Sequence, residues 1–196
     1  MTKDQTANVK GVQRAVERYG EPVKRSYTLP ISEAGVAYWR RVLTRRQSEV
    51  VFLIRRSNGF YVTHTKAFYP EGVYRLPSGG IKPGEDILTA LWREATEETN
   101  LTLHIEDFMA IIHYRFVRGQ EKLPFTSYLF RLQERGSHVL RSTDPEEEIT
   151  GFKKSTLSEV GALAGELESL SGEWRDWGRF RAVAHRVVAE LLTQEE

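Results

Sequence analysis

The order of hydrophobic and polar residues along the chain predicts several strands. Two apolar runs, at residues 50–56 and 60–65, flank a short Ser-Asn-Gly segment, which is typical of a β-hairpin with its turn at the Asn-Gly pair. Residues 101–117 and 125–133 are rich in aromatic and branched side chains, and this composition favours two longer strands. These four segments are the strands that the sequence predicts.

Hydrophobic residues three and four positions apart predict helices. Residues 32–47 show this spacing with arginines between the apolar positions, and Ser32 is placed to cap the helix. Residues 152–170 carry leucine and valine at the same spacing. Residues 1–26 are mostly polar with three valines at helical spacing, so they predict a short helix or a partly disordered arm.

A last helix is predicted over residues 173–192. Its apolar side chains lie along one stripe, formed by Trp177, Phe180, Ala184, Val187 and Leu191. A stripe of this kind needs a partner surface. We expect it to pack on the domain, to line the mouth of a substrate site or to bury against a second subunit in a homodimer.

Length and composition limit the classes of protein. A chain of 196 residues fits one domain with additions. It has no cysteine, so disulfides and thiolate metal sites are excluded. No apolar run approaches the ~18 residues of a membrane-spanning helix, and no signal peptide is recognisable. We therefore expect a cytoplasmic protein without a membrane partner.

The charge of the chain is unevenly distributed. Residues 1–47 hold ten lysines and arginines against four acidic residues, whereas the rest of the chain holds 18 against 23. The basic residues are not interleaved with stacking aromatic side chains, which disfavours nucleic acid as a partner. We expect residues 1–26 to be a basic arm that is solvated or docks a partner, and residues 27–196 to form the domain.

The chemistry of the sequence concentrates between residues 76 and 101. The first half contains two consecutive glycines and a Pro-Gly pair, which predicts a loop whose backbone can approach a ligand or metal closely. The second half predicts a helix that begins after Asp86, the N-cap. Asn100 stands where a left-handed residue would end it.

Three glutamates gather on one arc of this predicted helix, namely Glu94, Glu97 and Glu98. A different arc carries the apolar residues Leu88, Leu91, Trp92 and Ala95. Like charges three or four residues apart cost an isolated helix about 0.2–0.5 kcal/mol per pair, so a cation is needed to offset them. Carboxylates suit Mg²⁺, which usually binds through few protein ligands together with substrate phosphates. The alternative for such a run is a solvated acidic face.

The same stretch resembles the signature of the Nudix hydrolases, G-x5-E-x7-R-E-U-x-E-E-x-G-U, in which U is aliphatic. The matching positions are Gly79, Glu85, Arg93, Glu94, Glu97, Glu98 and Leu101. Ala95 takes the first U position, and Asn100 replaces the last glycine. Lys82 and Ser78 stand where many members carry an acid and a glycine. The resemblance covers 23 residues and favours the metal-binding interpretation of the glutamates.

The resemblance implies a fold, a reaction and a set of site residues. The fold would be of the α/β class, a Nudix-type α/β/α sandwich with a mixed sheet, here with N-terminal and C-terminal helical additions. Glu94, Glu97 and Glu98 would hold one or more Mg²⁺ ions, or Mn²⁺ in its place, with the Ser78 carbonyl as a backbone ligand. In supporting roles, Arg93 would orient a box glutamate, Glu85 would fasten loop to helix, and Gly79 would allow close approach.

Residues outside this stretch complete the predicted site. Arg55, Arg56, Lys66 and Arg75 are candidates for binding substrate phosphates, because arginine and lysine suit phosphate. Residues 142–148 form an acidic loop, and in similar proteins a glutamate from such a loop often completes the catalytic site. Glu147 and Glu148 match by position, and either of them or Glu94 could be the general base.

Three functions remain open from the sequence. The first is hydrolysis of the diphosphate in a nucleoside diphosphate linked to another moiety X, of the ADP-ribose or nucleotide-sugar type. The second is hydrolysis of nucleoside triphosphates or capped RNA. The third is a Nudix-like module that senses a nucleotide without cleaving it, although the intact glutamates Glu94, Glu97 and Glu98 argue against this function.

Overall fold

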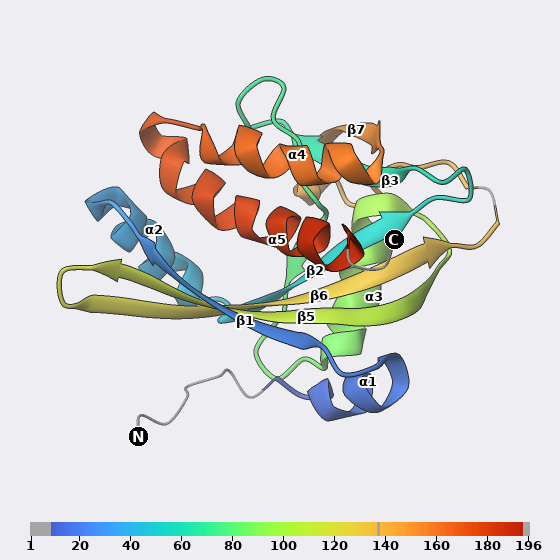
Figure 1. Cartoon of the computed structure of the whole chain (residues 1–196), viewed down its shortest axis with the longest axis horizontal. Coiled ribbons are helices and arrows are strands. Elements are labelled where there is room, and N and C mark those ends of the chain that lie inside the picture. Colours follow the sequence, from blue (N-terminus) through green and yellow to red (C-terminus); the bar gives the residue numbers. More distant parts are fainter. Residues whose placement is uncertain (1–8, 137, 194–196) are drawn as a thin grey trace.

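A mixed β-sheet forms the centre of the molecule, with helices against both of its faces (Figure 1). The structure is a computed structural model that describes residues 9–136 and 138–193. Its strands are β1 (Val23–Pro30), β2 (Ser48–Arg55), β3 (Tyr61–Lys66), β4 (Ser78–Gly80), β5 (Leu103–Arg118), β6 (Glu121–Glu134) and β7 (Ile149–Ser155).

Both parallel and antiparallel pairs occur in this sheet. The strand order is β1-β5-β6-β2-β3-β7, and β4 pairs with β2 outside this path. The pairs β1–β5 and β2–β6 are parallel, whereas β5–β6, β2–β3, β2–β4 and β3–β7 are antiparallel. The predicted hairpin of β2 and β3 is present, with Arg55 paired to Tyr61.

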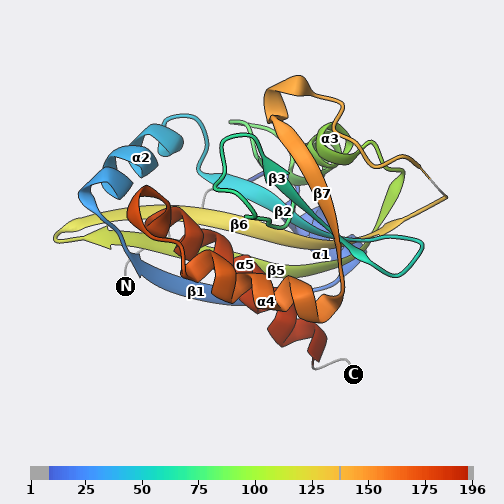
Figure 2. The same cartoon turned by 90° about the horizontal axis from the view of Figure 1, so that it is seen from above.

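The helices form two layers, one on each face of the sheet (Figures 1 and 2). The helices of the described residues are α1 (Val12–Tyr19), α2 (Glu33–Leu43), α3 (Ile87–Thr99), α4 (Leu157–Glu168) and α5 (Arg175–Thr193), with short 3-10 helices η1 (Pro145–Glu147) and η2 (Gly172–Trp174). Helices α2, α4 and α5 pack into one hydrophobic core, and α1 and α3 pack into another. The α/β/α sandwich with a mixed sheet is therefore confirmed.

Strand β2 connects the two cores. All but the last of its residues are buried, because helices cover both faces. Val51 and Leu53 point into the core that contains α5, whereas Val50, Phe52 and Ile54 point into the core that contains α3. This double burial explains why residues 50–56 are a continuous apolar run instead of an alternating one.

The predicted ends of two helices are present in the structure. The Ser32 side chain accepts a hydrogen bond from the backbone N–H of Gly35 at the start of α2. The Asp86 side chain accepts from the N–H of Leu88 at the start of α3. Asn100 ends α3 in the left-handed conformation, with φ 57° and ψ 22°. Local side-chain chemistry thus sets where the glutamate-bearing helix begins and ends.

Three strands were not predicted, namely β1, β7 and the short β4, whose residues were expected to be part of a loop. Strand β1 spans the expected boundary between residues 26 and 27, and it pairs with β5 at the edge of the sheet. On its inward face Arg25 stands among apolar residues and pairs with Glu190 of α5, so the hydrophobic alternation that signals a strand is broken. Helix α1 also packs into the core that contains α3, while residues 1–8 of the expected arm lie outside the described residues.

The helix predicted from residue 152 begins later in the structure. Residues 152–155 belong to β7, which pairs with β3 at the edge of the sheet, and α4 starts at Leu157 after the cap Thr156. The prediction of a helix over residues 152–155 was wrong. Strand β7 has exposed lysines and few buried positions, so its sequence carries little strand signal.

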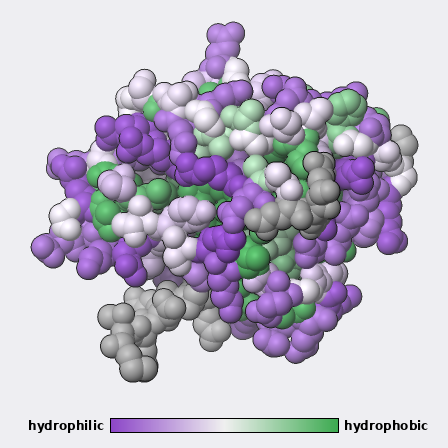
Figure 3. Space-filling view, in the orientation of Figure 1, coloured by the Kyte–Doolittle hydropathy of each residue, from purple (hydrophilic) through white to green (hydrophobic). Residues whose placement is uncertain are grey.

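The stripe of the last helix packs on the domain itself, which was the first of its three expected roles. Phe180, Ala184 and Val187 are buried in the core that contains α5, with Leu191 packed against it. Among the described residues, no helix is both long enough and apolar enough to cross a membrane. The face of the molecule seen in Figure 3 is mostly hydrophilic, with hydrophobic residues in small separate patches.

Candidate active site

The short strand β4 brings the glycine-rich loop against helix α3. A Cβ atom placed on Gly79 would lie 1.9 Å from the Glu94 carboxyl carbon, so this carboxylate occupies the space of a side chain. Gly80 is equally restricted, because a Cβ there would lie 2.5 Å from Cδ of Arg46. The two glycines are therefore explained by close approach of side chains to the backbone.

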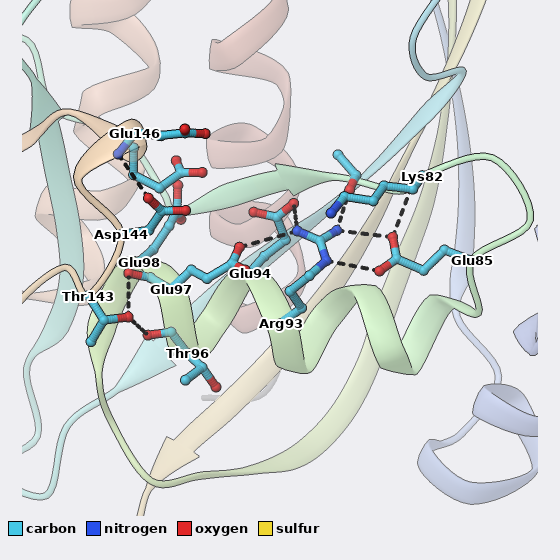
Figure 4. A network of polar contacts seen from close by, with 12 residues as sticks. Lys82, Glu85, Arg93, Glu94, Thr96, Glu97, Glu98, Thr143, Asp144 and Glu146 are labelled. Atoms are coloured by element: carbon cyan, nitrogen blue, oxygen red, sulfur yellow. Dashed lines mark hydrogen bonds and ion pairs between the residues drawn. The ribbon is translucent and has the colours of Figure 1, made fainter.

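Arg93 joins the loop to the helix, as its sequence position predicted (Figure 4). Its guanidinium donates to both carboxylate oxygens of Glu85, at 2.9 and 3.0 Å. It also donates to Oε1 of Glu94 at 2.7 Å, to Oε2 of Glu97 at 3.2 Å and to the Gly80 carbonyl at 3.0 Å. Burial alone would raise the pKa of Glu85, but the hydrogen bonds from Arg93 and from the Lys82 backbone hold it below its ordinary value.

The three glutamates of α3 differ in their exposure. Glu98 is fully buried, Glu94 is 5% exposed and Glu97 is half-buried. Among the described residues, neither carboxylate oxygen of Glu98 has a hydrogen-bond partner, and Nζ of Lys66 lies 3.7 Å from its Oε1. Burial raises the pKa of Glu98 to about 8 and also raises the pKa of Glu94. Ionised carboxylates in this position need a positive partner.

The apolar arc predicted for the same helix is confirmed at three of its four positions. Leu88, Leu91 and Ala95 are buried against the sheet. Trp92 is 37% exposed, so its assignment to the packed face was wrong. The buried part of the helix is shifted away from Trp92, since Glu94 and Glu98 are also buried, together with Ile87, Ala90 and Thr99.

The acidic loop lies beside the end of α3 (Figure 2). Thr143 donates its backbone N–H to the Glu97 carbonyl at 2.8 Å, and the Ser142 hydroxyl donates to the same carbonyl at 3.1 Å. At the other end of the loop, the Glu148 carbonyl accepts from the N–H of Ala67 at 2.9 Å. These bonds satisfy helix carbonyls that would otherwise be unpaired, and they fix the loop next to the glutamates.

The two glutamates of this loop have different surroundings. Glu147 is half-buried, and its Oε2 accepts from Lys66 Nζ at 2.6 Å. Oxygen atoms of Glu94, Glu97 and Glu147 lie within 4.8 Å of one another. Glu148 is exposed, with a left-handed backbone at φ 52°. The structure thus brings Glu147 to the carboxylates of α3, whereas Glu148 only borders the cleft.

Basic residues line the same cleft as these glutamates. The cleft has a volume of about 490 Å³, and its basic lining residues are Arg45, Arg46, Lys66, Arg75 and Arg181. Arg75 is 3% exposed and donates to the Leu76 carbonyl at 2.6 Å and to the Ser78 hydroxyl at 2.8 Å. Ser78 itself lines the cleft next to Gly79. Lys66 and Arg75 therefore line the same cleft as the glutamates, and their role in binding phosphate stays a prediction.

Two candidates for phosphate binding lie elsewhere. Arg55 is exposed at the end of β2, next to the hairpin turn, and is not among the residues that line the cleft. Arg56 donates to Oε2 of Glu134 at 2.7 Å and to the His138 carbonyl at 3.1 Å. The cleft lies at the opposite end of β2, where β4 pairs with Glu49, Val50 and Val51. Neither arginine is brought to the site.

The structure adds residues that the sequence did not indicate. Arg181 of α5 donates to both oxygens of the buried Glu49, at 2.9 and 3.0 Å, and to the Ser78 hydroxyl at 3.1 Å. His185, one turn further along α5, accepts from the Leu76 N–H at 3.1 Å through Nε2. Both lie on α5, whose apolar stripe was expected to pack against another surface. Polar residues beside such a stripe do not indicate a functional site from the sequence alone.

The residues present fit a divalent cation. Carboxylate oxygens from α3 and from the acidic loop converge, and the buried Glu98 carboxylate has two oxygens without hydrogen-bond partners. Oxygen donors of this kind are preferred by hard cations such as Mg²⁺. Exposed acidic groups often gather without a metal, but buried and unpartnered ones require compensation. Glu94, Glu97, Glu98 and Glu147 could therefore hold such an ion.

Fold and site together define the class of the protein, an α/β/α sandwich whose loop–helix motif presents carboxylates to a cationic cleft. The family model of the NUDIX domain matches residues 39–178. The chain therefore belongs to the Nudix family and is a Nudix hydrolase. Members of this family act on small-molecule nucleotide substrates and generally use divalent metal ions.

One protein is similar to this chain in sequence, and two solved structures are similar to it in fold. Nudix hydrolase 7 of Arabidopsis thaliana is 30% identical over 88 residues, a stretch that covers 45% of this chain and 28% of that relative. The Ap4A hydrolase of C. elegans has a similar structure, with a TM-score of 0.50 at 20% identity over 75% of this chain and 98% of that chain. The E. coli dihydroneopterin triphosphate pyrophosphohydrolase has a TM-score of 0.48 at 16% identity, over 71% and 97% of the two chains.

Proposed function

We propose that the protein is a Mg²⁺-dependent pyrophosphohydrolase that cleaves the diphosphate of a nucleoside diphosphate linked to a moiety X. The observation that carries this proposal is the buried Glu98 carboxylate, which has no hydrogen-bond partner among the described residues and lies 3.7 Å from Lys66, one of the cations that line the cleft. A sensor without chemistry has no need to bury such a group at a cost in stability. Family membership supports the same class of reaction.

In this proposal the basic and the acidic residues of the cleft have separate tasks. Lys66, Arg75 and Arg46 bind the phosphates, because their positive charges line the same cleft as the glutamates. Glu94, Glu97 and Glu98 would hold the metal ion, which supplies charge neutralisation at phosphate and a more acidic bound water. We also propose that the Ser78 carbonyl is a further ligand of this metal ion. Mn²⁺ would fit the same oxygen donors.

Three residues of the chain orient the reacting groups. Arg93 holds the Glu94 carboxylate at 2.7 Å and prevents its rotation away from the cleft. Glu85 in turn holds Arg93 by two hydrogen bonds. Glu147 is proposed as the general base that accepts a proton from the attacking water, since its carboxylate is held at the cleft by Lys66.

A substrate screen tests this proposal. ADP-ribose, nucleotide sugars, nucleoside triphosphates and capped RNA would each be incubated with Mg²⁺ or Mn²⁺, and phosphate-containing products would be separated and identified. We expect cleavage between the two phosphates of a nucleoside diphosphate derivative. Glu97→Gln and Glu98→Gln should each lower kcat by orders of magnitude, while Glu166→Gln, an exposed position on α4, should keep the parent rate. Near-normal metal-dependent turnover in both box variants would contradict the assignment.

A further inference from the structure

A second cavity adjoins the catalytic cleft. It has a volume of about 460 Å³, within the range of roughly 300–1,000 Å³ that is usual for small-molecule sites. It lies between α2 and the segment formed by η2 and the start of α5. Tyr38 and Trp177 line both this cavity and the cleft. A substrate held in the cleft by its phosphates can therefore extend into the cavity without leaving the protein surface.

Aromatic rings dominate the walls of this cavity. Trp174 and Trp177 are half-buried, with ring centroids 5.3 Å apart and an interplanar angle of 83°. Trp177 also contacts Tyr69 of the cleft, with centroids 4.8 Å apart. The Tyr38 ring already has the Arg41 guanidinium 5.9 Å from its centroid, so the tryptophans are the better ring faces for a ligand. Two indole rings at a right angle can contact a planar ring on its face and its edge.

This cavity differs from the cleft in the charge of its lining residues. Its charged lining residues are Glu173 and Asp176, and no lysine, arginine or histidine is among the described residues that line it. Asp176 accepts hydrogen bonds from the backbone N–H and the hydroxyl of Ser32, at 2.7 and 2.6 Å, and it pairs with Arg175 at 3.3 Å, so the negative charge that a ligand meets comes mainly from Glu173. The Glu173 residue is exposed at the rim. Indole faces and carboxylates both attract positive charge, whereas a further phosphate would be repelled.

The walls are fixed by a close contact between α2 and α5. A Cβ placed on Gly35 would lie 2.5 Å from Oδ2 of Asp176, so only glycine allows α2 to approach this closely. The Asp176 carboxylate bonds to the N-cap of α2 and thereby joins the two helices. Because these contacts between α2 and α5 hold both walls in place, little ordering is needed for binding.

We propose that this cavity, bounded by Trp174, Trp177 and Glu173, is the subsite for a positively charged planar ring in the moiety X of the substrate. The proposal rests on the proposed function, because the phosphates of that substrate occupy the neighbouring cleft. The proposal limits the moiety X to groups that carry a cationic ring.

A binding experiment without turnover tests the subsite directly. The probes are 1-methylnicotinamide, which is cationic, and nicotinamide, which is neutral and of similar shape. Two-dimensional NMR of the four tryptophan indole N–H groups reports where each probe binds. We expect the cation to shift the signals of Trp174 and Trp177 and to bind about five- to thirtyfold more tightly, the range of a cation–π contact. The exposed Trp92 on α3 serves as the internal control.

Variants separate the contributions of ring and charge. Glu173→Gln keeps the size of an exposed side chain, so it should fold as the parent does and reduce the preference for the cation. Trp174→Ala should weaken binding of both probes, whereas Trp92→Ala should leave both affinities unchanged. Equal affinities for the two probes, or no saturable shift at Trp174 and Trp177, would overturn the proposal.

A kinetic comparison relates the subsite to catalysis. NAD⁺ and NADH share one diphosphate and differ in the charge of the nicotinamide ring. We expect Glu173→Gln to lower kcat/KM for NAD⁺ by about threefold or more and to leave NADH unchanged. If neither these two nor any nucleoside diphosphate derivative of the substrate screen is cleaved although the probes bind at the tryptophans, the proposed function fails and the ring subsite stands. If both are cleaved and the variant affects them equally, the subsite fails and the proposed function stands.

Discussion

Protonation of His185 should destabilise the folded protein in mild acid. The ring is 1% exposed and uses both nitrogens, with Nδ1 2.8 Å from the Val160 carbonyl and Nε2 accepting from the Leu76 N–H at 3.1 Å. A second ring proton would have to sit on Nε2 and face the Leu76 N–H. Burial, together with the charges of Arg75 and Arg181, lowers the pKa of His185 to about 4.

The size and sign of the effect follow from this pKa. Between the ordinary value of 6.5 and about 4, the unfolded chain binds a proton that the folded protein does not. The contribution of His185 to stability is therefore complete above pH 6.5 and is lost as the pH falls toward 4. At about 1.36 kcal/mol per pH unit, the loss amounts to about 3 kcal/mol of unfolding free energy.

Urea unfolding of the parent and of His185→Gln at several pH values between 7.5 and 4.5 measures this loss. Glu98, whose pKa burial raises to about 8, changes stability in the opposite direction as the pH falls. The informative quantity is therefore the difference between the two proteins at each pH. We expect the advantage of the parent to shrink by about 2–3 kcal/mol over this range. His138→Gln, at an exposed position, is the control. Parallel profiles of the parent and His185→Gln would refute the reasoning.

Further predictions concern the loop, the helix end and the glycine of the site. Glu147→Gln should lose roughly 10²–10⁴ in kcat with little change in KM, and Glu148→Gln should lose far less, in steady-state assays. Equal small losses at both positions, with a large loss at Glu94→Gln, would move the base to α3. In thermal unfolding, Asn100→Gly should be neutral or slightly stabilising, whereas Asn100→Val should cost about 1–2 kcal/mol. Gly79→Ala should fold but lose at least about 10² in kcat, because its methyl group displaces the Glu94 carboxylate; a fully active variant would contradict this.

The sequence predicts the parts of the site that are close together in the chain. Asp86, Arg93 and Asn100 lie on one helix and its ends, where 3.6 residues per turn and capping chemistry determine the geometry. Such local features need no knowledge of the tertiary structure. Glu85 lies in the loop just before this helix and pairs with Arg93, a contact that the helical spacing does not predict because Glu85 stands outside the helix. The catalytic and metal-binding roles of the glutamates stay predictions.

Other residues of the site come together only through the tertiary fold. Arg181 meets Glu49 across 132 residues of sequence, and no periodicity connects a position in β2 with one in α5. Arg55 and Arg75 have the same side chain, yet one lies beside the hairpin turn and the other is buried in the cleft. The side chain of an arginine makes it able to bind phosphate, whereas its position in the folded sheet decides whether it lies at the cleft.

The pairing of β2 has a consequence for how activity is gained during folding. This strand is hydrogen-bonded to β6, β3 and β4, and its parallel contact with β6 joins segments far apart in the chain. Contacts between distant segments close late and slow the folding of a domain. The glycine strand β4, which positions Gly79 against Glu94, has no sheet partner other than β2. Catalytic activity should therefore return in step with the last and slowest phase of refolding, and a partly folded chain should be inactive even when helix α3 has formed.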